Sequence, residues 1–466
     1  MKVAIHWFRR DLRVADNTAL VQACNQAERV VPVFILEDAL RTGVDVGAAR
    51  LAFLLRSLSV LSGKLKDLGY RLVVRRGRSE IEIPKLCSEL GAEAVFCNRR
   101  YEPYAQERDA RVMQALQKQG IALQSFKDAV VWEDRELLNK SGSPYTVFTP
   151  YAKPWRVRNF QLPRGQLKVA DPNAPTIPSV EIPLDPAQFG HPLKHEVIPA
   201  GEDAAMRNLE LFLDRKLATY DSDRNIPAVD GTSKLSPHLR CGTIGIRTIL
   251  TRVAAAGKNA SPGARKSVTT FENELIWREF YLQILSNFPH VMRGAFRPEY
   301  DRLQWQYDEQ AFEKWRSGMT GYPIVDAAMR CLQTTGWMHN RLRMIVAMFL
   351  TKDLLFNWQL GERYFMKELV DGDMAANNGG WQWSAGTGTD AAPYFRIFNP
   401  ITQAKKCDAD GIFVRQWIPE LRSVSDENIH EPWNERLLAK GYPDRIVIHE
   451  QQRSKCLAMY KAVLSR

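Results

Sequence analysis

Short apolar runs alternate with amphipathic stretches over the first 130 residues, and this alternation restricts the fold more than any other feature. The runs typical of buried parallel strands are Val3–Phe8, Val30–Leu36, Leu72–Arg76 and Ala94–Cys97. The stretches 48–68, 80–90 and 104–119 instead show helical periodicity. A repeated strand–helix–strand order predicts an α/β domain with a doubly wound parallel sheet.

No phosphate-binding fingerprint follows the first of these strands. The next residues are Arg9-Arg10-Asp11-Leu12-Arg13 rather than G-x-G-x-x-G, and G-x-x-x-x-G-K-[ST] is absent from the chain. Both motifs need glycine where the backbone approaches a phosphate group. The sequence therefore disfavours an ordinary nicotinamide-dependent enzyme and a P-loop ATPase.

The remainder of the chain has a different texture. Residues 161–200 hold eight prolines and little periodicity, which is typical of an irregular connector. Helical patterns follow at 204–218, 243–256, 269–285, 324–335, 340–356 and 361–369. We therefore expect an α/β domain over 1–130, a connector over 131–200 and a large all-α domain over 201–466.

The formal charge of +11 favours an anionic partner, nucleic acid first, although a basic soluble protein without such a partner would look the same. The seven cysteines are odd in number and form no C-x-x-C pair, so neither a disulfide framework nor a metal site is expected. The start resembles no signal peptide, and no apolar run is long enough to span a membrane. We expect a cytoplasmic protein.

Asp371–Trp383 is the stretch whose composition folding alone explains least well. Its thirteen residues include two carboxylates, two adjacent amides, a Gly-Gly pair and two tryptophans. Glycine allows close backbone approach, and indoles offer flat surfaces for stacking. The alternative is a solvated Asn/Gly turn followed by a buried tryptophan.

A second motif places Glu274, Trp277, Arg278 and Tyr281 at i, i+3, i+4 and i+7, hence on one face of a helix. An acid, an indole, a guanidinium and a phenol together suit a cavity for a flat polar ligand. An amphipathic surface helix with an internal ion pair is the alternative.

A third motif repeats this spacing with Trp337, Asn340, Arg341 and Met344, and Arg343 borders the same surface. One helix thus offers an amide, fixed positive charge and a soft thioether close together.

A fourth motif, Gly231–Pro237, has small hydroxyl residues before a proline and could hold an anion or simply cap a helix. By spacing alone, Trp305, Trp358 and Trp381 are core residues, and only a redox cofactor would make them an electron path.

With these motifs assembled, the chain resembles the DNA photolyase/cryptochrome family over essentially its whole length, most closely the bacterial class I cyclobutane pyrimidine dimer photolyases. The matching blocks are Trp7–Arg13, Gly231–Ser236, Glu274–Tyr281, Thr320–Arg330, Trp337–Met344 and Asp371–Trp383. The resemblance implies a carbon–carbon lyase that repairs DNA with blue light.

The resemblance also implies FAD, folded into a U inside the helical domain. The residues implied to hold FAD are Tyr220, Thr232, Ser233, Leu235, Ser236, Trp337, Asn340, Arg343, Asp371, Asp373 and Asn377. Asn377 should face the flavin N5, where photolyases carry Asn and many cryptochromes do not.

The implied reaction begins when excited, fully reduced flavin gives an electron to a cyclobutane pyrimidine dimer; the ring opens and the electron returns. The lesion is flipped out of the duplex, at a cost of a few kcal/mol or less. Implied catalytic residues are Glu274, Trp277, Asn340, Met344 and Trp383. Implied DNA contacts are Arg224, Glu274, Arg278, Tyr281, Arg341 and Lys405. Trp381, Trp358 and Trp305 match the photoreduction chain, proximal to distal.

An antenna chromophore in the α/β domain is the least specific implication. Tyr104-Ala105 stand where the best-known bacterial enzymes carry the Asn-Glu pair that binds methenyltetrahydrofolate. The residues that match the polar contacts of deazaflavin-type enzymes are Arg10, Arg50, Glu102 and Arg240. We expect 8-hydroxy-5-deazaflavin, with methenyltetrahydrofolate, a flavin or an empty site as alternatives.

The implied partner is UV-damaged DNA that contains pyrimidine dimers, bound by a monomer. Met344, together with the absence of a His-His pair in Trp337–Met344, favours cyclobutane dimers over the (6-4) photoproduct. The chain ends at Arg466 without the long polar extension common in signalling cryptochromes. The alternatives are a cryptochrome-like blue-light photoreceptor without repair activity and, outside the family, a nucleic-acid-binding protein with an aromatic cavity.

Overall fold

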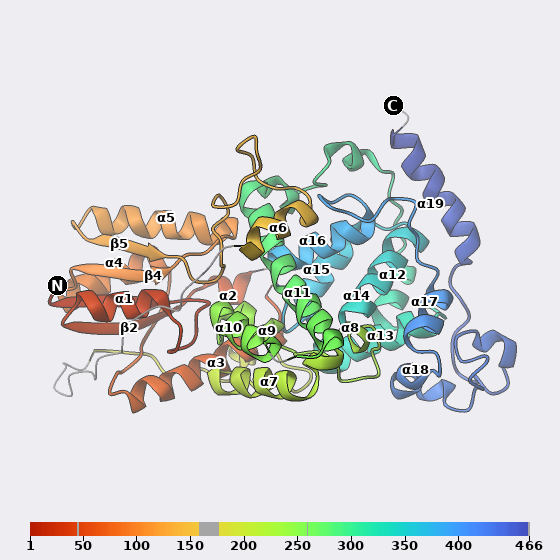
Figure 1. Ribbon diagram of the computed structural model, residues 1–466, viewed down its shortest axis with the longest axis horizontal. Coiled ribbons are helices and arrows are strands. Elements are labelled where there is room, and N and C mark those ends of the chain that lie inside the picture. The colour runs from red at the N-terminus through yellow and green to blue at the C-terminus, as the bar shows by residue number, and fades with distance from the viewer. Residues whose placement is uncertain (44–45, 158–176, 259, 465–466) are drawn as a thin grey trace.

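The protein has a sheet-containing part at its N-terminal end and a larger helical part that continues to the C terminus (Figure 1). The structure is a computed structural model that describes residues 1–43, 46–157, 177–258 and 260–464. None of the helices within these ranges combines the length and the apolar character needed to cross a membrane.

A five-stranded parallel sheet with strand order β3-β2-β1-β4-β5 forms the core of the N-terminal part. Its strands are β1 Val3–Phe8, β2 Arg29–Leu36, β3 Val73–Arg76, β4 Ala94–Asn98 and β5 Ala122–Phe126. The four predicted strands are confirmed. The prediction missed β5 because this edge strand is only partly buried and lacks the apolar run of the inner strands.

Helices cover both faces of the sheet, which confirms the doubly wound prediction. Ala4 and Phe8 of β1 pack in one cluster with α1 Thr18–Gln26 and α3 Ala48–Asp67. Ile5 and Trp7 of the same strand point the opposite way. They pack in a second cluster with α4 Ser79–Leu90 and α5 Pro103–Gln117. The period-2 alternation of strand side chains thus produces two separate cores.

Residues 158–176 of the connector predicted over 131–200 lie outside the described residues. After them, 177–200 has no regular structure except a 3₁₀ turn at Pro186–Phe189. Before them, the connector contains a helix that the sequence did not suggest, α6 Phe148–Val157.

The helical part begins at α7. Its helices are α7 Glu202–Arg215, α8 Tyr220–Asp223, α9 Ser236–Cys241, α10 Ile246–Gly257, α11 Pro262–Asn287, α12 Glu309–Ser317, α13 Pro323–Thr335, α14 Asn340–Met348, α15 Trp358–Glu368, α16 Met374–Ala385, α17 Pro400–Cys407, α18 Ile412–Trp417 and α19 His449–Leu464. The predicted helices are present with shifted ends. The helix predicted over 340–356 is wrong in its last part. The α-helix α14 ends at Met348, and a π-helical turn at Phe349–Asp353 follows it.

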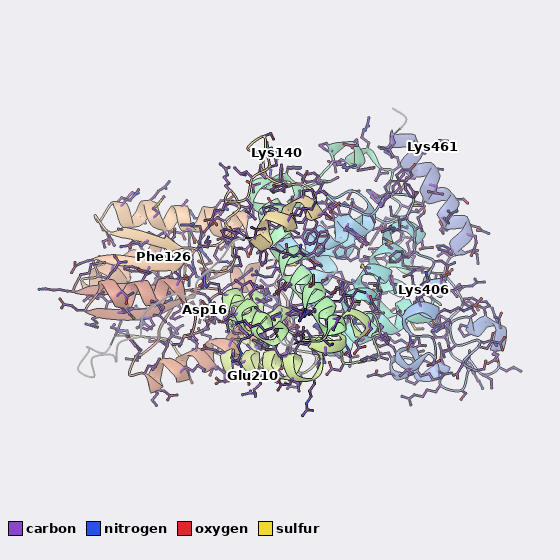
Figure 2. All side chains as sticks on the ribbon, viewed as in Figure 1. Asp16, Phe126, Lys140, Glu210, Lys406 and Lys461 are labelled. Carbon is purple, nitrogen blue, oxygen red and sulfur yellow. The ribbon has the colours of Figure 1, made fainter. Side chains whose placement is uncertain are left out.

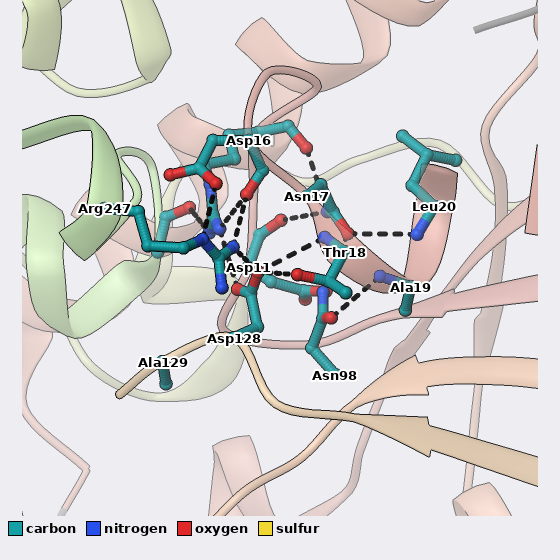
Figure 3. A network of polar contacts seen from close by, with 12 residues as sticks. Asp11, Asp16, Asn17, Thr18, Ala19, Leu20, Asn98, Asp128, Ala129 and Arg247 are labelled. Carbon is teal, nitrogen blue, oxygen red and sulfur yellow. Dashed lines mark hydrogen bonds and ion pairs between the residues drawn. The ribbon is translucent and has the colours of Figure 1, made fainter. Parts of the chain in front are cut away.

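A buried polar network joins the two parts of the chain (Figure 3). Arg247 of α10 donates to the carboxylates of Asp16 and Asp128 at 2.8 and 2.7 Å, and Arg13 donates to Asp128 at 2.7 Å. Although burial opposes the charged form, the guanidinium groups of Arg13 and Arg247 lower the pKa of Asp128 below its ordinary value. The network therefore ties the segments that follow β1 and β5 to α10, and removing one partner would leave a buried charge unpaired.

Candidate functional site

Side chains fill most of the space between the helices (Figure 2), but a cavity of about 500 Å³ remains in the helical part. That volume lies within the range of cofactor and ligand sites. The predicted site residues that line it are Tyr220, Arg224, Thr232, Ser233, Leu235, Ser236, Arg240, Glu274, Trp277, Arg278, Tyr281, Trp337, Asn340, Arg343, Met344, Asp371, Asp373, Asn377, Trp381 and Trp383. Four motifs separated in sequence therefore converge on one cavity.

Helix α11 forms one wall with the face formed by Glu274, Trp277, Arg278 and Tyr281. The alternative with an ion pair inside the helix is wrong, because Glu274 pairs with Arg224 at 2.6 Å. Arg278 instead donates to the carbonyl oxygen of Ala129 at 2.9 Å, and burial lowers its pKa.

Asp371, which lines the cavity, has one carboxylate oxygen without a partner among the described residues. Its Oδ2 accepts from Ser236 Oγ at 2.6 Å and from Arg343 Nη2 at 2.8 Å. Its Oδ1 is buried and has no hydrogen-bond partner among the described residues. The Nε1 of Trp337, another cavity residue, is also buried without one. Buried polar atoms are nearly always bonded, so both atoms fit contacts to a polar ligand.

Helix α16 forms another wall of the cavity. It begins where Asp373 Oδ1 accepts from the backbone N–H groups of Ala375 and Ala376, and it ends at Gly386 with φ +80. The solvated-turn interpretation of Asp371–Trp383 is therefore wrong. Asn377 Nδ2 donates to the Glu362 carbonyl oxygen at 2.9 Å, which leaves Oδ1 as the end of this amide that can accept from a ligand.

The adjacent glycines of α16 have different surroundings. A Cβ at Gly379 would overlap the ring of Tyr281, so glycine lets α11 and α16 approach closely. A Cβ at Gly380 would meet nothing within 4 Å, and Gly380 lines the cavity.

Helix α14 begins at Asn340 because His339 caps it: the His339 imidazole accepts from the Arg341 backbone N–H at 3.1 Å. Burial, followed by the nearby charges of Arg343 and Arg341, lowers the pKa of His339 to about 4, so its imidazole stays neutral and can accept. Asn340 and Met344 then reach the cavity, whereas Arg341 does not line it and donates to Asn225.

The three predicted electron-transfer tryptophans share one core cluster. Trp381 is 2% exposed and lines the cavity, Trp358 is 3% exposed and does not line it, and Trp305 is partly buried. Gly361 of α15 leaves room for the Trp381 ring. The order from cavity to periphery is compatible with the predicted chain, which stays a prediction.

The predicted antenna residues gather where the sheet meets the helical part. Arg10 pairs with Glu102 at 2.6 Å, Arg50 donates to the Met366 carbonyl oxygen, and Arg240 Nε donates to the Gly372 carbonyl oxygen at 2.8 Å. Burial and the charges of Arg10 and Arg50 hold the pKa of Arg240 well below its ordinary value. Arg240 also lines the main cavity, so it is not confined to a separate antenna pocket.

Lys405 lies apart from the cavity on α17, where it is exposed and pairs with Glu431 at 2.6 Å. The structure thus does not group Arg341 and Lys405 with the cavity residues, and their contacts with DNA stay predictions.

Sequence reasoning missed the apolar lining of the cavity. These residues include Phe271, Leu275, Met338, Ala347, Phe365 and Leu369. Phe271 and Leu275 continue the face of Glu274 and Arg278, so extending that face by one turn would have found them. The others look like ordinary core residues in the sequence.

Comparisons with known proteins cover both parts of the chain. Residues 4–170 match the family model described as DNA photolyase, and residues 271–462 match the FAD binding domain of DNA photolyase. A deoxyribodipyrimidine photo-lyase from a Synechococcus strain is 41% identical over 465 residues, which cover 98% of this chain and 96% of that protein.

Two solved structures have the same fold. A bacterial class III photolyase from Agrobacterium tumefaciens has a TM-score of 0.91 and 37% identity, covering 100% of this chain and 98% of that one. An archaeal photolyase from Sulfolobus tokodaii, solved with two FAD molecules, has a TM-score of 0.87 and 31% identity, covering 99% and 100%.

Proposed function

The chain belongs to the DNA photolyase family, and from this premise we propose that it splits cyclobutane pyrimidine dimers in UV-damaged DNA with light, using FAD. The observation that carries the proposal is the single cavity of about 500 Å³ with two different walls. One wall offers the acceptors of Asp371 and Asn377, and the other offers the indole of Trp277 beside the carboxylate of Glu274. A polar cofactor and the flipped-out pyrimidines of a dimer can therefore be held against each other.

The residues present fit FAD. Asp371 Oδ1 and Asn377 Oδ1 can accept from hydroxyl or N–H groups of the cofactor, and Arg343 supplies fixed positive charge beside them. The hydroxyl groups of Thr232 and Ser233 suit its phosphates. Bound FAD supplies the light-driven electron that opens the cyclobutane ring.

The lesion would lie against the indoles of Trp277 and Trp383. Stacking a base on an aromatic side chain contributes about 1–3 kcal/mol, which offsets much of the cost of flipping the damaged bases out of the duplex. Glu274 is held by Arg224 through Oε1, so its Oε2 remains for a polar group of the lesion. Asn340 and Met344 close the same pocket.

Replacing Glu274 with alanine is expected to lower repair per absorbed photon and to weaken binding of dimer-containing DNA by roughly tenfold or more, because a hydrogen bond to a charged group is lost. FAD content should not change. The matched control is Glu272→Ala, on the same helix but outside the cavity lining. If Glu274→Ala repaired and bound dimer-containing DNA as well as wild type does, the proposed role of Glu274 would be wrong.

The alternative of a photoreceptor without repair differs in two measurable ways. Such a protein would undergo flavin photoreduction. It would bind dimer-containing and undamaged DNA equally well and would not repair the dimer in the light. Full-length likeness to a deoxyribodipyrimidine photo-lyase supports repair. A DNA-binding protein without a cofactor would yield colourless protein with no extractable FAD.

We also propose a second, antenna chromophore at the junction that holds Arg10, Arg50, Glu102 and Arg240, with 8-hydroxy-5-deazaflavin favoured over methenyltetrahydrofolate. The support is the cluster of cationic side chains around Glu102 at the carboxyl ends of β1 and β4. A relative that holds two FAD molecules makes FAD a further candidate. Extraction and mass analysis of the bound chromophores tests all three.

The proposed roles follow the expected domains: the antenna is held by 1–130 with Arg240 from the helical domain, 131–200 connects the two, and 201–466 binds FAD and DNA. The odd number of cysteines and the lack of a C-x-x-C pair in the sequence favour a reducing cytoplasm. We propose that the protein acts there as a monomer.

A further inference from the structure

Trp277 already has a stacking partner on one of its two faces. The ring of Phe148, the first residue of α6, lies parallel to it, with the ring centroids 3.8 Å apart and an interplanar angle of 1°. Phe148 does not belong to the cavity lining, whereas Trp277 does. Phe148 therefore stacks on Trp277 from outside the cavity lining, which leaves the cavity side of Trp277, bordered by the Tyr281 ring with centroids 5.4 Å apart, for a base.

The segment around Phe148 is tied to the chain that follows Trp383. Asp390 Oδ2 accepts from the Phe148 backbone N–H at 3.0 Å, and Thr389 Oγ1 donates to the Thr146 carbonyl oxygen at 2.7 Å. The first N–H groups of a helix lack partners within the helix and favour a nearby negative charge, so a carboxylate from another segment suits this position. We call Thr146–Phe148 together with Thr389–Asp390 the clasp.

Helix α6 is also fixed to α11, the helix that carries Trp277. The Trp155 indole donates to Glu279 Oε1 at 2.7 Å, and the Phe148 ring packs edge-on against Phe280 with centroids 6.0 Å apart. Two sets of contacts therefore hold Phe148: its ring packs against α11, and its backbone is bonded to Asp390 within the clasp.

We propose that Phe148 is a positioning residue for recognition of the lesion: it holds Trp277 in one orientation, and the clasp sets the spacing between Trp277 and Trp383. This inference rests on the proposed function, since it assumes that the dimer binds against these two indoles. A cyclobutane ring locks two bases in one relative geometry. Rigid indoles at a fixed spacing can therefore discriminate the dimer from flexible undamaged bases.

Phe148→Ala is expected to lower the preference of the FAD-loaded, full-length protein for dimer-containing over undamaged duplex by roughly 3- to 10-fold, the worth of one aromatic pair. Affinity for undamaged DNA, FAD content and repair per photon at saturating DNA should remain those of wild type. Phe148→Tyr keeps the ring and should keep the preference. Asp390→Ala should lower it less, because it loosens the clasp and leaves the ring in place.

A double-mutant cycle tests whether Phe148 acts through Trp277. In a Trp277→Ala background, Phe148→Ala should cause no further loss, because the ring that it orients is gone. An equal loss in both backgrounds, or an unchanged preference in both Phe148→Ala and Asp390→Ala, would overturn the inference. If the wild-type protein showed neither a preference for dimer-containing DNA nor light-dependent repair, the proposed function itself would be wrong, whatever the variants do. If Phe148→Ala does not fold, Asp390→Ala decides alone: a lowered preference supports the inference, and an unchanged preference overturns it.

Discussion

Asp371→Ala is expected to purify largely without FAD. Asp371 is 6% exposed, and its Oδ2 receives both Ser236 and Arg343 while Oδ1 remains for the cofactor. Its removal leaves the Arg343 guanidinium without its carboxylate partner and deletes a cofactor contact. A hydrogen bond to a charged group contributes about 1.5–3 kcal/mol, so losing this contact should lower FAD affinity by roughly 10- to 100-fold.

The measurement is the ratio of FAD to protein after purification, together with the dissociation constant on adding FAD back. Asp371→Asn keeps an acceptor but not the charge and should fall between alanine and wild type. Asp203→Ala is the control, because Asp203 is an exposed acid that pairs with Lys64, and neither residue lines the cavity. Stoichiometric FAD with wild-type affinity in Asp371→Ala would show that this carboxylate does not hold the cofactor.

Trp381→Phe is expected to prevent photoreduction of oxidised flavin on the wild-type time scale and to spare repair by chemically reduced protein. Of the three tryptophans in the predicted chain, Trp381 alone lines the cavity. A phenyl ring is much harder to oxidise than an indole, so phenylalanine keeps the packing and interrupts the supply of electrons. Repair needs a flavin that is already reduced and therefore does not depend on this supply.

The measurement follows flavin absorbance under blue light with an external reductant, and then repair after reduction in the dark. Trp315→Phe is a matched control, since Trp315 is fully buried in the same core, 6.2 Å from Trp381 between ring centroids, but does not line the cavity. Loss of repair in reduced Trp381→Phe, or equal loss of photoreduction in Trp315→Phe, would contradict the assignment.

The sequence allowed the inner sheet and most helices to be predicted because burial on two faces leaves continuous apolar runs, as in β1 and β2. It did not reveal β5, whose edge position removes the need for such a run. The end of α14 was also missed, because nothing in its apolar sequence signals the change to a π-helical turn. Both misses reflect tertiary surroundings that override local pattern.

The cavity could be predicted in outline because its polar residues repeat at helical spacing, as Glu274 and Trp277 do. The partners of those residues could not. Arg224 reaches Glu274 from α8 and the following turn, and Phe148 reaches Trp277 from α6, and only the packed fold brings them together. Family resemblance supplied roles for the lining residues but not for Phe148, which stands behind the lining.

Light-dependent repair is the most direct test of the central claim. Purified protein with fully reduced FAD is mixed with a duplex that carries one defined cyclobutane pyrimidine dimer, and restored thymines are counted after near-UV or blue light and after darkness. We expect restoration only in the light, with many dimers repaired per protein molecule and Glu274→Ala repairing fewer per photon. Bound, reducible FAD without any repair in the light would contradict the account and favour a photoreceptor.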